Sequence, residues 1–285
     1  MATIGIMDSG VGGLSVLREI LTLLPDGKYI YYADNANCPY GEKSPEFIRE
    51  RCRSITELML SRGAQAMVLA CNTATAAAVQ TLRSEYPIPF IGMEPAVKPA
   101  AKMTRSGVVG VLATAGTLKG LKYLTTKSRF EGDVSIVERV GRGFVELVES
   151  GELTGPHAEE VVAESLGPLL AEGADTVVLG CTHYPFLLGT LQKVAGPEVQ
   201  FIDPAPAVAR HLEEVLKEHG IPPADAEPGI ELLSSGAPDA LKSLRDLLCF
   251  SNPSRLTPTA PFRGTPPSAP QPSGGSAASI SSKSR

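Results

Sequence analysis

The sequence lacks the features that mark several classes of protein. It has only five cysteines, at positions 38, 52, 71, 181 and 249, and no Cys-x-x-Cys pair. An odd, dispersed set of this kind fits reduced thiols in a cytosol better than a disulfide framework. No apolar stretch approaches the roughly 20 residues that a membrane-spanning helix needs. We therefore expect a cytoplasmic protein with no membrane contact.

Basic clusters and a leader segment are missing as well. Lys and Arg total 26 against 31 Asp and Glu, which gives a formal net charge of −5. This balance provides no general attraction to nucleic acid or to an anionic membrane surface. The first residues, MATIGIMDSG, lack a charged segment followed by an apolar one. We therefore expect no signal peptide and no nucleic-acid partner.

The chain does have a regular alternation of short apolar runs and amphipathic stretches. Leucines recur at helical spacing between Leu14 and Leu24, and a second periodic stretch begins at Pro45, a residue that suits the first turn of a helix. Runs typical of strands occupy residues 2–8, 28–34, 64–70, 88–93, 107–113, 134–140, 176–180 and 199–203. Apolar strands separated by helices predict an α/β fold built on parallel sheets covered on both faces.

The order of these segments predicts two similar domains and a tail. A strand, a small residue and a cysteine occur in sequence at 64–71 and again at 176–181. We therefore expect two pseudo-symmetric, doubly wound parallel-sheet domains with the active site between them. Residues 1–95 with about 207–250 are assigned to the first domain, and residues 96–206 to the second. Residues 251–285 are rich in Pro, Ser, Thr and Gly, which predicts a disordered tail.

Chemically active side chains gather where the predicted strands end. In open parallel sheets, ligands bind at the carboxyl ends of the strands. The residues at these ends are Asp8, Asp34, Cys71, Thr114, Cys181 and Asp203. Thr114 and Thr117 in the segment ATAGT place two hydroxyls at one such end, and hydroxyls suit carboxylate or phosphate oxygens.

The two strand-end cysteines lie in matched settings. Cys71 opens a helix, where the helix dipole is expected to lower the pKa of a thiol. Cys181 is followed by Thr182 and His183, and an imidazole close to a thiol can exchange its proton. Free cysteines are often inert core residues, which is the alternative for each one taken alone. Together, the pair predicts cysteine acid–base chemistry.

Two other kinds of site share some of these residues. The loop DSGVGGLSV, residues 8–16, resembles a dinucleotide-binding turn, but its spacing misses the required pattern at Ser15. A tight turn with close contact between helix and strand is the alternative. A zinc set could combine Cys71, Cys181, His183 and Asp8, but structural zinc usually takes closely spaced ligand pairs. We expect no metal.

Six segments taken together resemble a known family. They are DSGVGGLSVL (8–17), CPYGEKS (38–44), ACNTATAAA (70–78), GMEPAVKPA (92–100), ATAGT (113–117) and GCTHYPFL (180–187). In this order the segments resemble the bacterial glutamate racemases of the aspartate/glutamate racemase superfamily, over roughly residues 3–248. One departure is that Gly141 and Arg142 stand where the family often has Cys-Pro, ahead of the segment that contains Glu149.

The resemblance implies interconversion of L-glutamate and D-glutamate for peptidoglycan synthesis, without pyridoxal phosphate, metal or any other cofactor. Cys71 and Cys181 are similar to the two acid/base cysteines, Asp8 and His183 to their respective partners, and Glu149 to an auxiliary carboxylate beside the histidine. The expected substrate contacts are Asp8, Ser9, Tyr40, Gly41, Asn72, Thr73, Thr114, Thr117, Thr182 and His183. We expect a homodimer. The alternatives are another member of the superfamily such as an aspartate racemase, a decarboxylase or isomerase with one working cysteine, or a binding protein for acidic amino acids.

Overall fold

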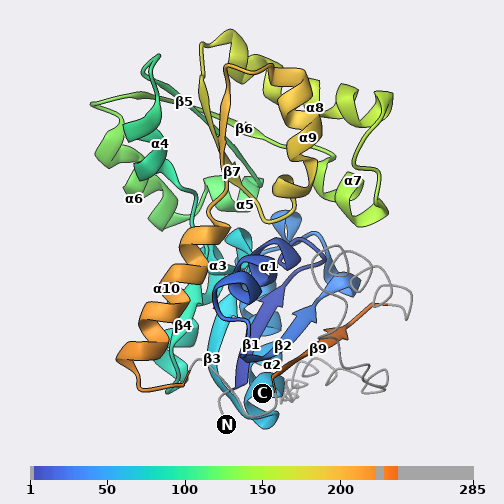
Figure 1. Ribbon diagram of the computed structural model, residues 1–285, viewed down its shortest axis with the longest axis vertical. Helices are drawn as coiled ribbons and strands as arrows, with labels where there is room; N and C mark the ends of the chain where they lie inside the picture. The colour runs from blue at the N-terminus through green and yellow to red at the C-terminus, as the bar shows by residue number, and fades with distance from the viewer. Residues whose placement is uncertain (1–2, 223–227, 237–285) are drawn as a thin grey trace, which may run out of the picture.

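Two parallel β-sheets flanked by helices make up the computed structural model, which describes residues 3–222 and 228–236 (Figure 1). The α/β class expected from the alternating segments is confirmed. The predicted tail, residues 251–285, lies outside the described residues.

The first sheet has the strand order β4-β3-β1-β2-β9, and its strands all run parallel. They are β1 (Thr3–Asp8), β2 (Lys28–Ala33), β3 (Ala64–Leu69), β4 (Phe90–Gly92) and β9 (Gly229–Ser234). One face carries α1 (Leu14–Leu23) and α10 (Ala205–Glu218), and the other carries α2 (Pro45–Ser61) and α3 (Asn72–Glu85). Helices on both faces explain why the strands read as continuous apolar runs.

The second sheet has the order β6-β5-β7-β8 and is also parallel. Its strands are β5 (Val108–Ala113), β6 (Ser135–Val140), β7 (Thr176–Gly180) and β8 (Gln200–Ile202). On one side lie α7 (Phe144–Ser150), α8 (Pro156–Ala171) and α9 (Leu188–Ala195), and on the other α4 (Val97–Met103) and α6 (Leu121–Phe130). Short connections complete the chain: η1 (Asn35–Asn37), η2 (Tyr40–Glu42), α5 (Ala115–Leu118) and η3 (Tyr184–Leu187).

The two sheets share one strand pattern. In the first, β3 lies between β4 and β1, and β2 follows β1; in the second, β7 lies between β8 and β5, and β6 follows β5. Strand β3 of the first sheet is therefore the equivalent of β7 in the second. The loop after each of these strands begins with a cysteine-containing segment. Equivalent strand ends thus carry Cys71 and Cys181.

Local sequence explains where helix α2 begins. The side chain of Ser44 accepts a hydrogen bond from the backbone N–H of Phe47 at 3.2 Å, and Pro45 occupies the first helical position. A hydroxyl at the N-cap satisfies one of the free N–H groups of the first turn, and proline has no N–H to satisfy there. The predicted start of this helix is confirmed.

Strand β9 was not predicted from the sequence. It pairs with β2 along its whole length, from Lys28 beside Gly229 to Ala33 beside Ser234. Only Ile230 and Leu233 of this edge strand are buried, so its apolar residues do not alternate in the way a half-buried strand requires. Its pairing with β2 brings a C-terminal segment to the loop that follows β2.

The apolar core fixes the helix that follows the first loop. Leu17 and Ile20 of α1 and Leu212 of α10 are fully buried in one cluster, and burying each such side chain contributes about 1.5–3 kcal/mol. Anchoring α1 in this way holds residues 9–13, which precede it. Within the described ranges no helix combines the length and the apolar character needed to cross a membrane.

Candidate active site

Cys71 and Cys181 meet at one site although they come from different sheets. Cys71 follows β3 and is 5% exposed, and Cys181 follows β7 and is 6% exposed. Thr182, the residue after Cys181, lies 3.5 Å from Oδ2 of Asp8, and Ser9, the residue after Asp8, lies 3.9 Å from Sγ of Cys71. The structure therefore brings together the two thiols that the sequence placed in matched settings.

Cys71 caps α3. Its Sγ accepts a hydrogen bond from the backbone N–H of Ala74 at 3.5 Å and lies 3.9 Å from the Oγ of Ser9. Burial raises the pKa of the Cys71 thiol well above its ordinary value, and the Asp8 carboxylate raises that pKa further. The N–H of Ala74 at the helix N-terminus does lower this pKa, as expected, but desolvation and the charge of Asp8 outweigh its effect.

Asp8 ends β1 and is fully buried. The backbone N–H of Gly13 donates to its Oδ2 at 2.7 Å, and the Oγ1 of Thr182 lies 3.5 Å from the same oxygen. Burial raises the pKa of Asp8, although His183 and the Gly13 N–H oppose this shift. The N–H that a dinucleotide phosphate would use at the start of α1 is thus occupied by a carboxylate. This arrangement speaks against the dinucleotide alternative.

Cys181 has a histidine and a carboxylate beside it. The Nδ1 of His183 lies 3.7 Å from the Sγ of Cys181, and its Nε2 lies 2.7 Å from Oε1 of Glu149. Burial disfavours the charged imidazole, yet the contacts with Cys181, Cys38 and Glu149 raise the pKa of His183 well above its ordinary value. Despite its own burial, the pKa of Glu149 is lowered by the hydrogen bond to His183 and by the Val11 N–H. The arrangement is an imidazolium–carboxylate pair next to a thiol.

Glycines let the first loop approach this pair. A Cβ added at Gly12 would lie 2.3 Å from Nδ1 of His183, and one added at Gly10 would lie 1.9 Å from Oε1 of Glu149. Real Cβ atoms do not approach other atoms so closely, so only glycine fits at either position. Gly10 and Gly12 therefore allow close contact with side chains that belong to the second half of the chain. The tight-turn alternative for this loop agrees with the structure.

Three threonine hydroxyls form a cluster between the sheets. Thr73 Oγ1 lies 2.8 Å from Thr114 Oγ1 and 3.4 Å from Thr117 Oγ1, and the last two are 2.9 Å apart. Thr114 also caps α5 through the N–H of Thr117. Gly41 adjoins the cluster, because a Cβ there would lie 3.1 Å from Thr114. These four predicted substrate contacts thus come together.

Asn72 stands out among the predicted contacts. Its side chain is buried, and neither its Oδ1 nor its Nδ2 has a hydrogen-bond partner among the described residues. Buried amides are normally satisfied, so an unpartnered one directly after Cys71 indicates a polar ligand. Tyr40 differs, because its hydroxyl donates to Asp34 at 2.6 Å and Arg51 holds the same carboxylate at 2.9 Å. The side chain of Tyr40 thus supports the loop, which leaves its backbone as the part available to a substrate.

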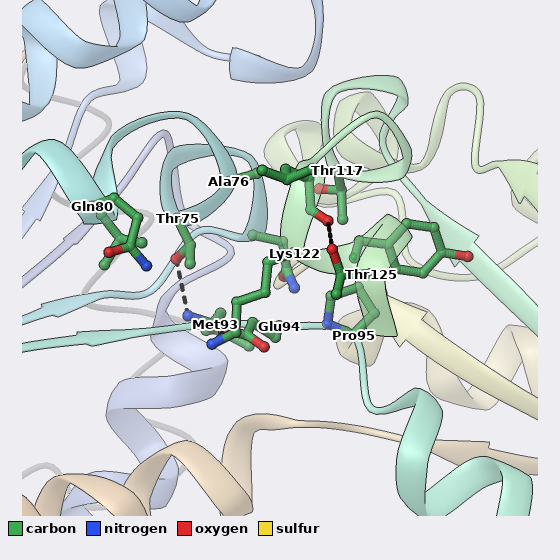
Figure 2. A pocket seen from close by; sticks show the side chains of 13 residues that line it. Thr75, Ala76, Gln80, Met93, Glu94, Pro95, Thr117, Lys122 and Thr125 are labelled. Carbon is green, nitrogen blue, oxygen red and sulfur yellow. Dashed lines mark hydrogen bonds and ion pairs between the residues drawn. The ribbon is translucent and has the colours of Figure 1, made fainter. Parts of the chain in front are cut away.

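The cavity in Figure 2 lies beside these groups and has a volume of about 370 Å³. Asn72 and Thr117, both predicted substrate contacts, are among the residues that line it. Thr75 of α3 accepts a hydrogen bond from the N–H of Met93, and Lys122 of α6 pairs with Glu94. Elements that pack on both sheets therefore line this cavity, which shares Asn72 and Thr117 with the predicted site.

The side chains whose potential metal-ligand atoms lie close together differ from the zinc set considered in the sequence analysis. In the part of the chain that the structure describes, the His, Cys, Asp and Glu side chains with ligand atoms within 4.8 Å of one another are Cys38, Glu149 and His183. Cys71, Cys181 and Asp8 do not belong to this group. Two of its three members already form the imidazolium–carboxylate pair, so the observed contacts account for it without an ion.

Comparison with known proteins identifies the class. The family model described as Asp/Glu/Hydantoin racemase matches residues 4–212, and the chain belongs to that family. Within the family it is similar to glutamate racemases: 51% identical over 248 residues to that of Ectopseudomonas mendocina, covering 87% of this chain and 94% of the relative. The glutamate racemase of Pseudomonas aeruginosa is 48% identical with the same coverage of both chains.

Solved structures agree with this placement. A glutamate racemase from Escherichia coli, in complex with L-glutamate and the activator UDP-MurNAc-Ala, has a TM-score of 0.80 and 36% identity, covering 90% of this chain and 97% of its own. A glutamate racemase from Bacillus anthracis has a TM-score of 0.79 and 31% identity, covering 90% of this chain and 96% of its own. The family resemblance stated from the sequence segments is therefore confirmed.

Some residues of the site were not predicted from the sequence. Cys38 lies 3.7 Å from Oε1 of Glu149, the Nδ2 of Asn35 donates to Oε2 of the same carboxylate at 3.0 Å, and Val11 donates its N–H to Oε1 at 2.8 Å. Ser15 donates to the carbonyl oxygen of Thr182 at 3.0 Å. The one feature of the sequence that could have indicated Cys38 and Asn35 as site residues is their position just after a predicted strand.

Proposed function

We propose that this protein interconverts L-glutamate and D-glutamate by cofactor-independent, two-base racemisation, and so supplies D-glutamate for peptidoglycan in the cytoplasm. The observation that carries the proposal is the meeting of two buried thiols from equivalent strand ends of two sheets. Inverting a carbon centre requires one group that removes a proton from one face and a second group that delivers a proton to the other. Two cysteines can perform both steps when one is a thiolate, which removes the proton, and the other is a thiol, which delivers one.

Each thiol has its own acid–base partner. In the L-to-D direction, the family resemblance assigns proton removal to Cys181 and proton delivery to Cys71. The raised pKa of Cys71 suits the delivering role, because a buried thiol beside Asp8 keeps its proton until a stronger base needs it. His183, held by Glu149, lies next to Cys181 and stabilises its thiolate as an ion pair. In the D-to-L direction the two cysteines exchange roles.

The remaining residues bind the substrate. The α-proton of an amino acid is weakly acidic, so the site must stabilise the negative charge that develops when it leaves. The unpartnered amide of Asn72, the hydroxyls of Thr73, Thr114 and Thr117, and the N-termini of α3 and α5 supply hydrogen-bond donors for two carboxylates. Ser9, Thr182 and the backbone of Tyr40 and Gly41 complete the proposed contacts.

The assembly of the chain is part of the same proposal. In this proposal residues 1–95 with about 207–250 form the first domain and residues 96–206 the second, and residues 223–227 and 237–250 lie outside the part of the chain that the structure describes. Two sheets of matched strand order, and the packing of α10 against α1, support this division. We further propose a homodimer. The activator in the E. coli structure is bound to that protein.

One experiment tests the activity. Pure protein is incubated in heavy water with L-glutamate and, separately, with L-aspartate, without added cofactor. Loss of optical rotation with deuterium incorporation at Cα of glutamate is the expected result. Racemisation of aspartate but not of glutamate would show that the substrate is aspartate. Deuterium exchange without inversion would contradict the two-base mechanism. A requirement for pyridoxal phosphate or a metal would contradict the cofactor-free chemistry.

A further inference from the structure

Glu149 belongs to the second sheet's helix α7 but is held by residues of the first sheet. Its Oε1 accepts from the N–H of Val11 at 2.8 Å, and its Oε2 accepts from Nδ2 of Asn35 at 3.0 Å. The carboxylate therefore has the position seen here only when the loops after β1 and β2 face α7. We propose that Asn35 is a positioning residue for the racemase reaction, which fixes Glu149 so that Glu149 aligns His183 with Cys181. The inference rests on the proposed function.

The orientation of the Asn35 amide follows from its partners. An ionised carboxylate only accepts hydrogen bonds, so the NH₂ group must face Glu149. The amide oxygen then faces Ser234, whose hydroxyl donates to it at 2.8 Å. Ser234 ends strand β9, and the adjacent Ser235 donates to Asp34 at 2.6 Å. The edge strand thus braces the loop that presents Asn35.

Two further contacts connect Glu149 to the sulfur of Cys181. Glu149 Oε1 lies 2.7 Å from Nε2 of His183, and Nδ1 of that ring lies 3.7 Å from Sγ of Cys181. Asn35 bonds the other carboxylate oxygen, Oε2, so each of the two oxygens has its own donor. Fixing both oxygens fixes the plane of the carboxylate and hence the direction of its bond to the imidazole. Pre-arranged hydrogen bonds of this kind maintain catalytic geometry.

The titratable groups around Glu149 come from several elements. His183 follows β7, Cys38 lies between η1 and η2, and Tyr31 belongs to β2. Asp34 precedes Asn35 but is paired with Arg51 at 2.9 Å. An aspartate at position 35 would therefore place a second carboxylate beside Glu149. The only hydrogen bond to Glu149 that this substitution removes is the one from the Asn35 amide. Two carboxylates in such a position cannot both ionise readily, so one pKa rises strongly.

The test compares Asn35→Asp, Asn35→Ala and the control Ala36→Asp. Ala36 is exposed in the same loop, so its variant adds the same charge without facing Glu149. The ratio of variant to wild-type kcat/KM for glutamate is measured from acid to alkaline pH, with thermal melting to verify folding. For Asn35→Asp the ratio is near one at low pH, where the pair shares a proton that restores the donor, and it falls at least about tenfold as pH rises. Asn35→Ala loses about tenfold at every pH, and Ala36→Asp follows the wild type.

Other outcomes separate the possibilities. A pH-independent ratio for Asn35→Asp in an active, folded protein overturns the role of Asn35, and so does an unchanged rate in Asn35→Ala. Equal pH dependence in Asn35→Asp and Ala36→Asp would show that a charge in the loop, and not the hydrogen bond, is responsible, which also overturns the inference. A wild-type protein without racemase activity overturns the proposed function instead.

Discussion

The Oγ1 atoms of Thr73 and Thr114 lie 2.8 Å apart, although Thr73 belongs to the first turn of α3 and Thr114 caps α5 beside the second sheet. The contact joins the N-termini of two helices from different sheets. Each N-terminus presents free N–H groups and a partial positive charge. Together with the adjacent amide of Asn72 they form a concentrated set of donors. A substrate with two carboxylates matches this set.

Removing one of these hydroxyls is expected to weaken glutamate binding. Thr114→Val deletes a donor and the cap of α5, and we expect KM to rise about tenfold, since a hydrogen bond to a charged group contributes about 1.5–3 kcal/mol. Thr22→Val is the control, because Thr22 is exposed on α1 and bonds only the carbonyl of Arg18 in its own helix. Steady-state kinetics in both directions is the measurement. An unchanged KM in Thr114→Val would contradict the proposed carboxylate site.

Both strand-end thiols are expected to be indispensable. Cys71→Ser and Cys181→Ser should each lower kcat/KM by at least the roughly 10²–10⁴ that a general acid or base provides. Cys52→Ala is the matched control: Cys52 is fully buried in the core, and burial raises the pKa of its thiol to about 12. The control should keep its activity while losing some thermal stability. Near wild-type rates in either serine variant would contradict two-base catalysis.

Adding one methyl group to the first loop should misplace the histidine. Gly12→Ala puts a carbon 2.3 Å from Nδ1 of His183, a buried ring that is held by Glu149 at 2.7 Å. A displacement of about 1 Å in a catalytic group can cost about 10²-fold in rate. Gly189→Ala is the control, because nothing lies within 4 Å of a Cβ at that position. We expect a loss of kcat in Gly12→Ala with a normal circular dichroism spectrum, and equal rates in the two variants would refute the contact.

The sequence predicted the parts of this protein that depend on short segments. Strands, the first turn of α2 and the positions of Cys71 and Cys181 at strand ends follow from apolar periodicity and from residues such as Pro45. The lowering effect of the helix N-terminus on the pKa of Cys71 was predicted, but the net pKa is raised, because the depth of burial and the approach of Asp8 are not visible in the sequence. Local patterns show the donors of a site but not its dielectric environment.

Contacts between segments that are far apart in the sequence could not be predicted from it either. Glu149 was expected only through the family resemblance, and only the folded chain shows Val11 and Asn35 bonded to it. Strand β9 was missed because its burial depends on β2, to which it pairs, and not on its own apolar pattern. Long-range packing of this kind overrides local propensity. The residues that support the site are therefore the ones that sequence reasoning omitted.

The His183–Glu149 pair should give the protein a pH-dependent stability that Glu149→Gln removes. The pKa of His183 is raised above its ordinary 6.5, so its contribution is complete below that value and is lost as pH rises through the folded pKa. The pKa of Glu149 is lowered below its ordinary 4.5, so its contribution is present above that value and is lost as pH falls through the folded pKa. The stability difference between wild type and Glu149→Gln should therefore be largest between about pH 4.5 and 6.5 and should persist above this range until His183 deprotonates. Urea unfolding at a series of pH values measures this difference. Glu149→Gln should also lower the pKa of His183, because an amide no longer favours the imidazolium, and the ¹⁵N chemical shifts of the ring report that pKa directly. A His183 pKa that does not move in the variant would mean that the carboxylate does not hold the charge on the imidazole.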